Sequence, residues 1–560
     1  MWYNVGMETR DIEKILSEYD RWKENTSERH SEQLCLDSLI ADDRELYDSF
    51  YKEIKFGTSG LRGIIGLGPN RMNRYVVNRA TRGLADYLNK ANPAGAKVII
   101  SYDTRNHSEE FAEISAQVLR EMGINAMMFR EPTPVPVLSY AIRREKADMG
   151  IMITASHNPK IYNGYKVYNS KGHQIVGDEA NEIMTHIHLW DYFDMPKEDI
   201  ESCRLPHEVS ADFIDYTVKL TDEALSNIQK HSDKNIRIIY TPLNGTGMNF
   251  VPEVLKRRGF NNVVTVVSQE MPDGNFPTCP VPNPEKIAAY NEAFYTLDQE
   301  EGDIIIATDP DCDRVGVAMY FDGVKRILTG NQIGILLFDF LCSNLEDVRG
   351  RLAMRSIVST ALFDKIAAEH GVEVIKTLTG FKYMGKIMSD LEEQGDIDRF
   401  LFAFEESNGF LFNNDIRDKD GVGGALLIAE MAAYYRGIGI SLPEKLDQIY
   451  DYHGQYHDKT ENYVFQGVEG RDIMEGIMSY FRDNIKGFLG GIEILDKIDY
   501  LNEEDDLRED ILEFKLRDHG IFIIRPSGTE PKLKAYFFGN RDTRKIESEV
   551  ANIIDMFRAR

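Results

Sequence analysis

The sequence is poor in cysteine and contains no long apolar run. Its five cysteines stand far apart and include no C-x-x-C pair: Cys35, Cys203, Cys279, Cys312 and Cys342. This spacing is typical of a protein from the reducing cytosol and does not suggest a disulfide framework. No stretch approaches the ~18 apolar residues of a membrane span, and the N-terminus lacks the apolar core of a signal peptide. We therefore expect a soluble cytoplasmic protein with no membrane partner.

Positive charge is also scarce. The chain has 65 lysines and arginines against 92 acidic residues, which gives a formal net charge of -27. Such a chain repels nucleic-acid backbones, so we expect no nucleic-acid partner. The hydrophobic share of 42% and the charged share of 28% are ordinary for a globular protein. Because single cores stop growing near ~250 to 300 residues, 560 residues favour about three to five domains.

A recurring order of strand, polar loop and helix begins near residue 97. The segments that start this way are KVIISYDTRNHS, MGIMITASHNP, IRIIYTPLNGTGMNF, GDIIIATDPDCDR and EVIKTLTGFKYMG. Near-continuous apolar strands alternating with helices predict α/β units on mostly parallel sheets, where ligands bind beyond the carboxyl ends of strands. The last hundred residues contain GIFIIRP and KLKAYFF beside EILDKIDYL and predict a smaller α+β domain. Residues 11–22 show helical apolar spacing and predict an amphipathic helix.

The segment ATDPDCDRVGV carries three aspartates at alternate positions, Asp309, Asp311 and Asp313. On an extended backbone alternate side chains point the same way, so their carboxylates would converge and repel one another without a cation. Hard oxygen ligands suit Mg²⁺. An EF-hand is excluded, because Arg314 and Tyr320 stand where glycine and glutamate are required. An aspartyl-phosphate phosphatase and plain turn capping stay open as alternatives.

MITASHNP places Ser156 outside the G-x-S-x-G frame of a hydrolase nucleophile. Further polar loops supply cations and hydroxyls: KFGTSGLRG, NGYKVY, FAFEESNGF and RPSGTEPKLK. The last can wrap a phosphate with a basic side chain, hydroxyls and free backbone N–H groups. Taken singly, RPSGTEPKLK and FAFEESNGF are more often ordinary turns, and a lysine such as Lys166 is more often a surface residue. His157, next to the serine, fits a structural and a catalytic role equally.

In combination and in this order, these motifs resemble the α-D-phosphohexomutase family, which includes phosphoglucomutases and phosphomannomutases. FGTSGLRG, TASHNP, NGYKVY, DPDCDR, TGFKYMG, EESNG, RDKDG and RPSGTEPK span residues 56–534. The N-terminal segment looks most like the long-chain branch of bacterial phosphoglucomutases and animal phosphopentomutases. The resemblance implies three α/β domains with mostly parallel mixed sheets and a smaller C-terminal α+β domain around a central cleft. We place these domains at residues 1–208, 209–322, 323–448 and 449–560.

The resemblance also implies roles for individual residues. Ser156 would carry phosphate, and its phosphoserine oxygen would hold Mg²⁺ together with Asp309, Asp311 and Asp313. Lys166 is the first candidate for the general base and His157 the second. The positions that match substrate contacts are Arg62, Arg314, Thr379, Glu405, Ser407, Lys419, Arg525, Ser527, Gly528 and Thr529. Phe404 departs from many relatives, which have glycine before the glutamate, and puts backbone packing at that loop in question.

The implied activity is that of a phosphoglucomutase acting on small-molecule sugar phosphates. Glucose 1-phosphate and glucose 6-phosphate would interconvert through phospho-Ser156, with glucose 1,6-bisphosphate as intermediate and activator. Phosphopentomutase, phosphomannomutase and glucose 1,6-bisphosphate synthase are alternatives on the same scaffold, because Glu405 and Ser407 do not identify the sugar. A non-catalytic sugar-phosphate sensor is disfavoured, since a sensor needs no phosphorylatable serine.

Overall fold

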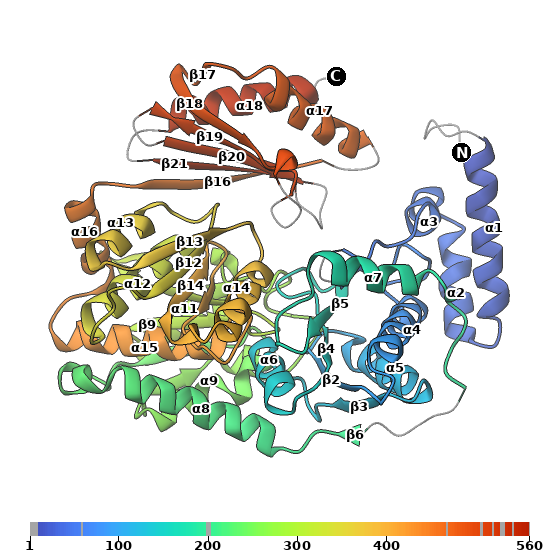
Figure 1. Cartoon of the computed structure of the whole chain (residues 1–560), viewed down its shortest axis with the longest axis horizontal. Helices are drawn as coiled ribbons and strands as arrows, with labels where there is room; N and C mark the ends of the chain where they lie inside the picture. Colours follow the sequence, from blue (N-terminus) through green and yellow to red (C-terminus); the bar gives the residue numbers. More distant parts are fainter. Residues whose placement is uncertain are drawn as a thin grey trace.

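The computed structural model describes residues 9–57, 60–197, 203–465, 469–503, 508–517, 520–526, 532–539 and 543–558. Its strands form four sheets that follow one another along the chain, and we refer to the corresponding parts as domains I to IV (Figure 1). The first three sheets mix parallel and antiparallel pairs, whereas the fourth is antiparallel. The expected architecture of three α/β domains and a C-terminal α+β domain is confirmed.

Three helices precede the first sheet and belong to domain I. They are α1 (Thr9–Asn25), α2 (His30–Leu39) and α3 (Asp43–Phe50). The predicted amphipathic helix is α1, which buries Ile15, Tyr19 and Trp22. The Trp22 ring lies 5.4 Å from the Tyr75 ring and 5.3 Å from the Phe193 ring, between centroids. The N-terminal helices are therefore packed into the core of domain I.

The domain I sheet has the order β1-β5-β4-β2-β3-β6. Its elements are β1 (Gly60–Ile64), α4 (Arg74–Ala91), β2 (Lys97–Tyr102), α5 (Ser108–Glu121), β3 (Asn125–Met128), α6 (Val135–Arg144), β4 (Met149–Ile153), β5 (Tyr162–Asn169), α7 (Gly177–Ile187) and β6 (Cys203–Arg204). Strand β2 runs parallel to β3 and β4, and β5 runs antiparallel to β1 and β4. The predicted strands KVIISY and MGIMI are β2 and β4, so their loops leave the same edge of the sheet.

Domain II has the sheet order β11-β10-β9-β7-β8. Its elements are α8 (Glu208–Ala224), β7 (Ile238–Thr241), α9 (Val251–Arg257), β8 (Val263–Thr265), α10 (Val267–Glu270), α11 (Asn291–Glu300), β9 (Ile304–Thr308), β10 (Val315–Phe321) and β11 (Val324–Ile327). All five residues of β9 are buried, and the aspartate loop follows this strand directly. Strand β11 lies beyond residue 322, where we place the domain boundary from the sequence, and still pairs with β10.

Domain III has the sheet order β13-β12-β14-β15. Its elements are α12 (Gly330–Asn344), β12 (Leu352–Ser356), α13 (Leu362–His370), β13 (Glu373–Thr377), α14 (Phe381–Glu393), β14 (Phe400–Glu405), β15 (Gly409–Leu411), α15 (Gly421–Gly437) and α16 (Leu442–His453). Within the described ranges no single helix is long and apolar enough to cross a membrane. Helices α15 and α16 meet that test only as a pair bent by 86°.

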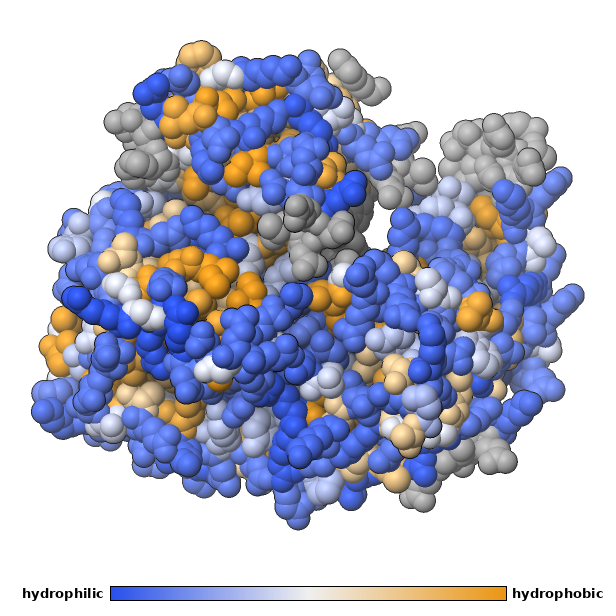
Figure 2. Space-filling view, viewed as in Figure 1, coloured by the Kyte–Doolittle hydropathy of each residue, from blue (hydrophilic) through white to orange (hydrophobic). Residues whose placement is uncertain are grey.

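Domain IV lies at the top of Figure 1 and has the sheet order β16-β21-β20-β19-β18-β17. Its elements are β16 (His457–Val464), α17 (Glu469–Asp483), β17 (Phe488–Leu489), β18 (Ile492–Asp499), β19 (Leu512–Leu516), β20 (Gly520–Pro526), β21 (Lys532–Gly539) and α18 (Arg544–Arg558). Figure 2 shows the surface hollowed between this domain and the N-terminal helices.

The hydrophobic cores divide the molecule unequally. One continuous cluster runs through domains I, II and III and includes Leu138, Ile306 and Leu426. Domain IV has a core of its own, formed by its sheet with α17 and α18. A small cluster joins domains III and IV, and its buried members are Val358, Leu378, Ile511, Ile523, Tyr536 and Phe538.

Candidate active site

Ser156 follows β4 in a strained but well-supported backbone conformation. Its φ is 52°, in the left-handed region that costs a non-glycine residue on the order of 1 kcal/mol. The Ser156 N–H donates to Thr154 Oγ1 at 2.8 Å, and that hydroxyl donates to Asp103 Oδ2 at 2.6 Å. Asp103 follows β2, the neighbour of β4. The parallel pairing of β2 and β4 therefore brings the support and the serine to one edge of the sheet.

Arg105 supports the same loop through its carbonyl groups. Its guanidinium donates to the carbonyls of Ser156, of Asn158 at 2.5 Å and of Pro159 at 3.0 Å. Its Nε lies 3.2 Å from Asp103 Oδ2, and both side chains are fully buried. A buried cation with this many acceptors holds the backbone in one arrangement. The Asp103–Arg105 pair thus fixes where Ser156 presents its hydroxyl.

The three aspartates of the loop after β9 converge as the spacing predicts. Asp309, Asp311 and Asp313 are buried, and one oxygen of each lies within 4.8 Å of the others. Burial, together with repulsion from Asp311 and Asp313, raises the pKa of Asp309 well above its ordinary value. One oxygen each of Asp311 and Asp313 lacks a hydrogen-bond partner within the described residues. Buried carboxylates with unused oxygens fit a hard divalent cation such as Mg²⁺.

Ser156 meets this cluster directly across the boundary of domains I and II. Its hydroxyl donates to Asp309 Oδ2 at 2.8 Å, while Thr154 Oγ1 lies 3.2 Å from Asp311 Oδ2. The Val135 N–H donates to the Asp311 carbonyl at 3.0 Å, which adds a backbone contact between the two domains. The structure therefore places the candidate phosphate carrier against the candidate metal ligands.

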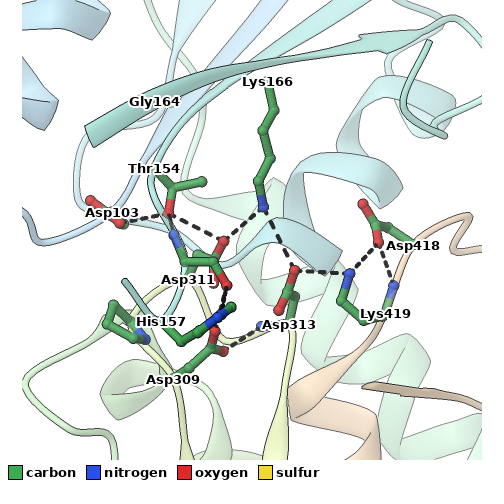
Figure 3. Close-up of polar contacts among 12 residues, drawn as sticks. Asp103, Thr154, His157, Gly164, Lys166, Asp309, Asp311, Asp313, Asp418 and Lys419 are labelled. Carbon is green, nitrogen blue, oxygen red and sulfur yellow. Dashed lines mark hydrogen bonds and ion pairs between the residues drawn. The ribbon is translucent and has the colours of Figure 1, made fainter. Parts of the chain in front are cut away.

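Two lysines complete the cluster (Figure 3). Lys166 Nζ lies 3.0 Å from Asp311 Oδ2 and 3.7 Å from Asp313 Oδ2, and Lys419 Nζ lies 3.1 Å from Asp313 Oδ2. Although burial alone would raise the pKa of Asp313, Lys419 and Lys166 lower it to about 2. Asp313 is therefore a carboxylate at neutral pH, as a metal ligand must be.

His157 also reaches the serine. Its Nδ1 lies 3.2 Å from Ser156 Oγ. Burial and then the positive charges of Arg314 and Arg62 lower the pKa of His157 well below its ordinary value. The imidazole is therefore neutral at pH 7 and has one ring nitrogen able to accept a proton.

Lys419 is held in place by a neighbour that links domains I and III. Asp418 accepts hydrogen bonds from Tyr168 OH at 2.9 Å, from Gln174 Nε2 at 2.7 Å and from Lys419 Nζ at 3.3 Å. A side chain at Gly409 would place its Cβ only 2.1 Å from Lys419 Cδ. Gly409, the glycine of EESNG, therefore leaves the space that the Lys419 side chain needs to reach Asp313.

Domain III contributes the predicted sugar-contacting loops. Glu405 ends β14, is 7% exposed and accepts the Gly380 N–H at 2.6 Å, so the loop containing Thr379 lies beside it. Ser407 is half-buried in the turn after Glu405. The Asn408 carbonyl of that turn accepts the N–H of the first residue of β10 at 3.0 Å. These hydrogen bonds connect the turn after Glu405 to β10, the strand that follows the aspartate cluster, and connect the loop containing Thr379 to Glu405.

Domain IV supplies paired cations. Arg525 and Lys534 lie opposite each other on β20 and β21. Burial and the charge of Arg525 lower the pKa of Lys534. Within the described part of the chain neither cation has a carboxylate at ion-pair distance. The other predicted phosphate contacts, Ser527, Gly528 and Thr529, lie outside the described residues.

The four domain models of phosphoglucomutase/phosphomannomutase match this chain in order. The alpha/beta/alpha domains I, II and III match residues 53–192, 212–320 and 329–452, and the C-terminal domain matches residues 493–556. The chain belongs to the phosphoglucomutase/phosphomannomutase family. This membership confirms the resemblance drawn from the motifs.

Curated members of the family extend along most of this chain. A phosphoglucomutase of Staphylococcus haemolyticus (strain JCSC1435) is 35% identical over 545 residues, which cover 92% of this chain and 97% of the relative. One of Staphylococcus aureus (strain N315) is 36% identical and covers 88% and 91%. The solved putative phosphomannomutase of Thermus thermophilus has a TM-score of 0.69 at 22% identity, over 90% of this chain and 99% of that chain. The solved structure supports the fold.

The phosphohexomutase motifs left several residues of this region unassigned. Asp103 and Arg105 lie in the quoted segment KVIISYDTRNHS, where an Asp-x-Arg pair directly after a predicted strand could have indicated them. Lys534 closes the quoted phosphate-loop motif, but only strand pairing places it beside Arg525. Glu285, which contacts Arg314, lies in a proline-rich loop whose sequence signals only a turn.

The departure at Phe404 is accommodated within domain III. Successive residues of a strand point to opposite faces, so Phe404 points away from the side that presents Glu405. Its ring lies 5.0 Å from the Phe363 ring, between centroids. A Cβ at Gly334 would lie 2.5 Å from the Phe404 ring. Glycine in α12 therefore makes room for this phenylalanine in the core.

Proposed function

We propose that this protein is a phosphoglucomutase that interconverts glucose 1-phosphate and glucose 6-phosphate. The observation that carries the proposal is the 2.8 Å contact between Ser156 Oγ and Asp309, within a buried cluster of three carboxylates from a different domain. A serine placed this way suits reversible phosphorylation, because a cation in the cluster would offset the charge of a phosphoserine. The relatives named phosphoglucomutase, which match along most of the chain, favour this reaction.

Substrate binding is divided between two domains in this proposal. Arg525 and Lys534 would hold the phosphate that is not reacting, since two neighbouring, largely desolvated cations that have no carboxylate at ion-pair distance within the described residues are stabilised when an anion binds them. The Ser527–Thr529 segment would contribute hydroxyl and backbone N–H donors. Glu405 and Ser407 would accept and donate hydrogen bonds at the sugar hydroxyls, with Thr379 beside them.

The reaction would proceed in two opposite transfers. The bond between Ser156 Oγ and phosphorus breaks while the free sugar hydroxyl forms a bond to the same phosphorus, which produces glucose 1,6-bisphosphate. A base of the protein takes the hydroxyl proton and passes it to the released Ser156 oxygen. After the bisphosphate turns around, its other phosphoryl group returns to Ser156, the proton returns to the sugar oxygen, and the isomeric monophosphate leaves. Arg62, Arg314 and Lys419 would balance the charge of the transferring group.

The aspartate cluster would hold Mg²⁺ through Asp309, Asp311, Asp313 and an oxygen of phospho-Ser156. Such an ion supplies neutralisation of the charge on the phosphoryl group. The protein's own residues prepare for it, because Lys166 and Lys419 keep Asp313 ionised. The backbone N–H groups of Asp313 and Arg314 donate to Asp309 Oδ1 at 3.2 and 3.0 Å and orient that carboxylate.

Two residues are placed to take the hydroxyl proton. Lys166 is the first candidate, and its Nζ lies at ion-pair distance from Asp311 and Asp313. His157 is the second and is held in the neutral form by burial and nearby cations, which lower its pKa. The pH profiles of kcat for Lys166→Arg and His157→Gln distinguish them, because removal of the base abolishes the acid limb of the profile.

The test is a set of initial rates with Mg²⁺ and trace glucose 1,6-bisphosphate. Glucose, mannose, ribose and deoxyribose 1-phosphates serve as substrates for wild type and Ser156→Ala. We expect glucose 1-phosphate to react fastest and the alanine variant to lose at least about 10⁴-fold in kcat, by analogy with loss of other catalytic nucleophiles. Ser38→Ala, at an exposed serine far from the site, is the control. If another sugar 1-phosphate reacts fastest, the protein is a mutase for that sugar and not a phosphoglucomutase. Full activity of Ser156→Ala would refute the phosphoserine mechanism.

A further inference from the structure

Glu285 lies at the end of the proline-rich loop before η4 (Ile287–Tyr290) and contacts the arginine of the aspartate loop. Its Oε1 accepts a hydrogen bond from Arg314 Nη1 at 2.7 Å. The turn that presents it is well supported, because the Glu285 N–H donates to Asn283 Oδ1 at 2.9 Å and Tyr290 OH donates to the Pro284 carbonyl at 2.8 Å. The carboxylate therefore has a defined position beside the site.

The Arg314 guanidinium lies between two acidic neighbours. Its Nη1 is hydrogen-bonded to Glu285, whereas its Nε stands 3.8 Å from Asp313 Oδ1, too far for a hydrogen bond. The Glu285 side chain is 35% exposed and the Asp313 side chain is 2% exposed. Coulomb attraction is stronger in a less hydrated environment. Without Glu285, the guanidinium would therefore move toward Asp313, whose Oδ1 has no other hydrogen-bond partner within the described residues.

That movement would damage the site in two ways. An arginine bound to Asp313 would occupy an oxygen that a divalent cation needs, and its positive charge would repel the cation. It would also move the guanidinium away from Glu285 Oε1, the position that it occupies in this structure. The backbone N–H of Arg314 is already fixed on Asp309 Oδ1 at 3.0 Å, so the choice between the two acceptors is made by the side chain alone.

We propose that Glu285 is a positioning residue that keeps the Arg314 guanidinium off Asp313 and thereby preserves the aspartate cluster for a divalent cation. The availability of Arg314 to a substrate phosphate is a second consequence, and this part rests on the proposed function. The effect on cation binding is inferred from the contacts of Arg314 with Glu285 and Asp313 and does not depend on the proposed function.

The test uses Mn²⁺ as a paramagnetic probe, with its dissociation constant measured by electron paramagnetic resonance on the purified full chain. The four proteins are wild type, Glu285→Gln, Arg314→Ala and the double variant. We expect Glu285→Gln to raise the Mn²⁺ dissociation constant about tenfold, a coupling typical of charged neighbours. In the Arg314→Ala background the same substitution should change it less than about twofold, because no guanidinium remains to be misplaced.

A matched control is Glu253→Gln, which removes another glutamate from domain II. Glu253 pairs with Arg257 at 2.6 Å, and both side chains are well exposed. We expect its Mn²⁺ dissociation constant to equal that of wild type. If Glu285→Gln does not fold, Glu285→Asp keeps the charge while shortening the side chain, and should raise the constant by a smaller factor that also vanishes without Arg314.

The inference is overturned if Glu285→Gln leaves the Mn²⁺ dissociation constant unchanged. It is also overturned if the effect of Glu285→Gln persists in the Arg314→Ala background, because Glu285 would then act by supporting the loop and not through Arg314. A failure of the proposed function is recognised separately. Wild type without mutase activity but with the Glu285-dependent Mn²⁺ binding would refute the phosphoglucomutase assignment and leave this inference standing.

Discussion

The two sides of the candidate site are built very differently. On the side of Ser156 and the aspartates, one large hydrophobic cluster joins domains I, II and III in addition to the separate clusters of domains I and II, and buried polar contacts link the three domains further. On the side of Arg525 and Lys534, domain IV has its own core and meets domain III through a small cluster and contacts such as Tyr383 OH to Glu509 at 2.8 Å. The chemistry is thus proposed for the half whose three domains are joined by the large hydrophobic cluster.

This difference assigns different physical tasks to the two halves. Phosphoryl transfer needs reacting groups held to within a fraction of an ångström, which the shared core and the Asp103–Arg105 support can provide. Binding the non-reacting phosphate needs mainly positive charge that accepts either end of the bisphosphate. Changes on the first side should therefore lower kcat, and changes on the second should mainly raise KM.

The largest effect should come from the cluster itself. Asp309→Asn replaces the carboxyl group that accepts the Ser156 hydroxyl and removes one proposed metal ligand. We expect kcat to fall about 10³-fold with little change in KM, since the loss affects charge stabilisation in the transition state. Steady-state kinetics at saturating Mg²⁺ measure this, with the exposed Asp298→Asn as control. A change confined to KM would contradict the division of tasks.

The opposite pattern should appear in domain IV. Lys534→Met removes one of two paired cations while retaining an unbranched side chain. We expect KM for the sugar phosphate to rise about 10- to 100-fold and kcat to change less, as charge-assisted hydrogen bonds contribute to binding. Lys515→Met, at an exposed pair with Asp496, should behave like wild type. Should kcat fall as far as in Asp309→Asn, Lys534 would have to act in the chemical step.

A smaller effect should reveal the contacts between domains I and III. A hydrogen bond from Arg143, and then the charge of Arg417, lower the pKa of Glu392 from 4.5 to about 2. A carboxyl with a depressed folded-state pKa stabilises the fold above its unfolded value, and this stabilisation is lost as the pH falls from 4.5 to about 2. We expect Glu392→Gln to lower the thermal midpoint by about 1 °C at pH 7, because the group is partly exposed and screened.

Thermal scans at pH 7, 4.5 and 3 measure how the difference from wild type shrinks in acid. The neighbouring Asp390→Asn is the control, because Asp390 pairs with Lys386 of the same helix on the open surface. An equal loss of stability at pH 7 in both variants would mean that the Arg143–Glu392 contact has no special weight between the domains.

The sequence by itself determined the strands and the chemistry that follows them. Near-continuous apolar runs predicted β2, β4 and β9, and the polar residues just after β4 and β9 are Ser156 and the three aspartates. These features are local, since strand propensity and the alternation of side chains depend on neighbours in the chain. The family motifs extended these predictions to the loops of domain III. There Glu405 accepts the Gly380 N–H, and Lys419 pairs with Asp313 of the aspartate cluster.

Only the tertiary structure decided which residues support those groups. Arg105 on the Ser156 loop, Lys534 beside Arg525 and Glu285 on Arg314 are contacts between separate segments of the chain. Likewise, Phe404 is compatible with the Glu405 loop because Gly334, on a distant helix, leaves space for its ring. Such partners have no local signature, because burial, strand pairing and packing bring them together only after the whole chain has folded.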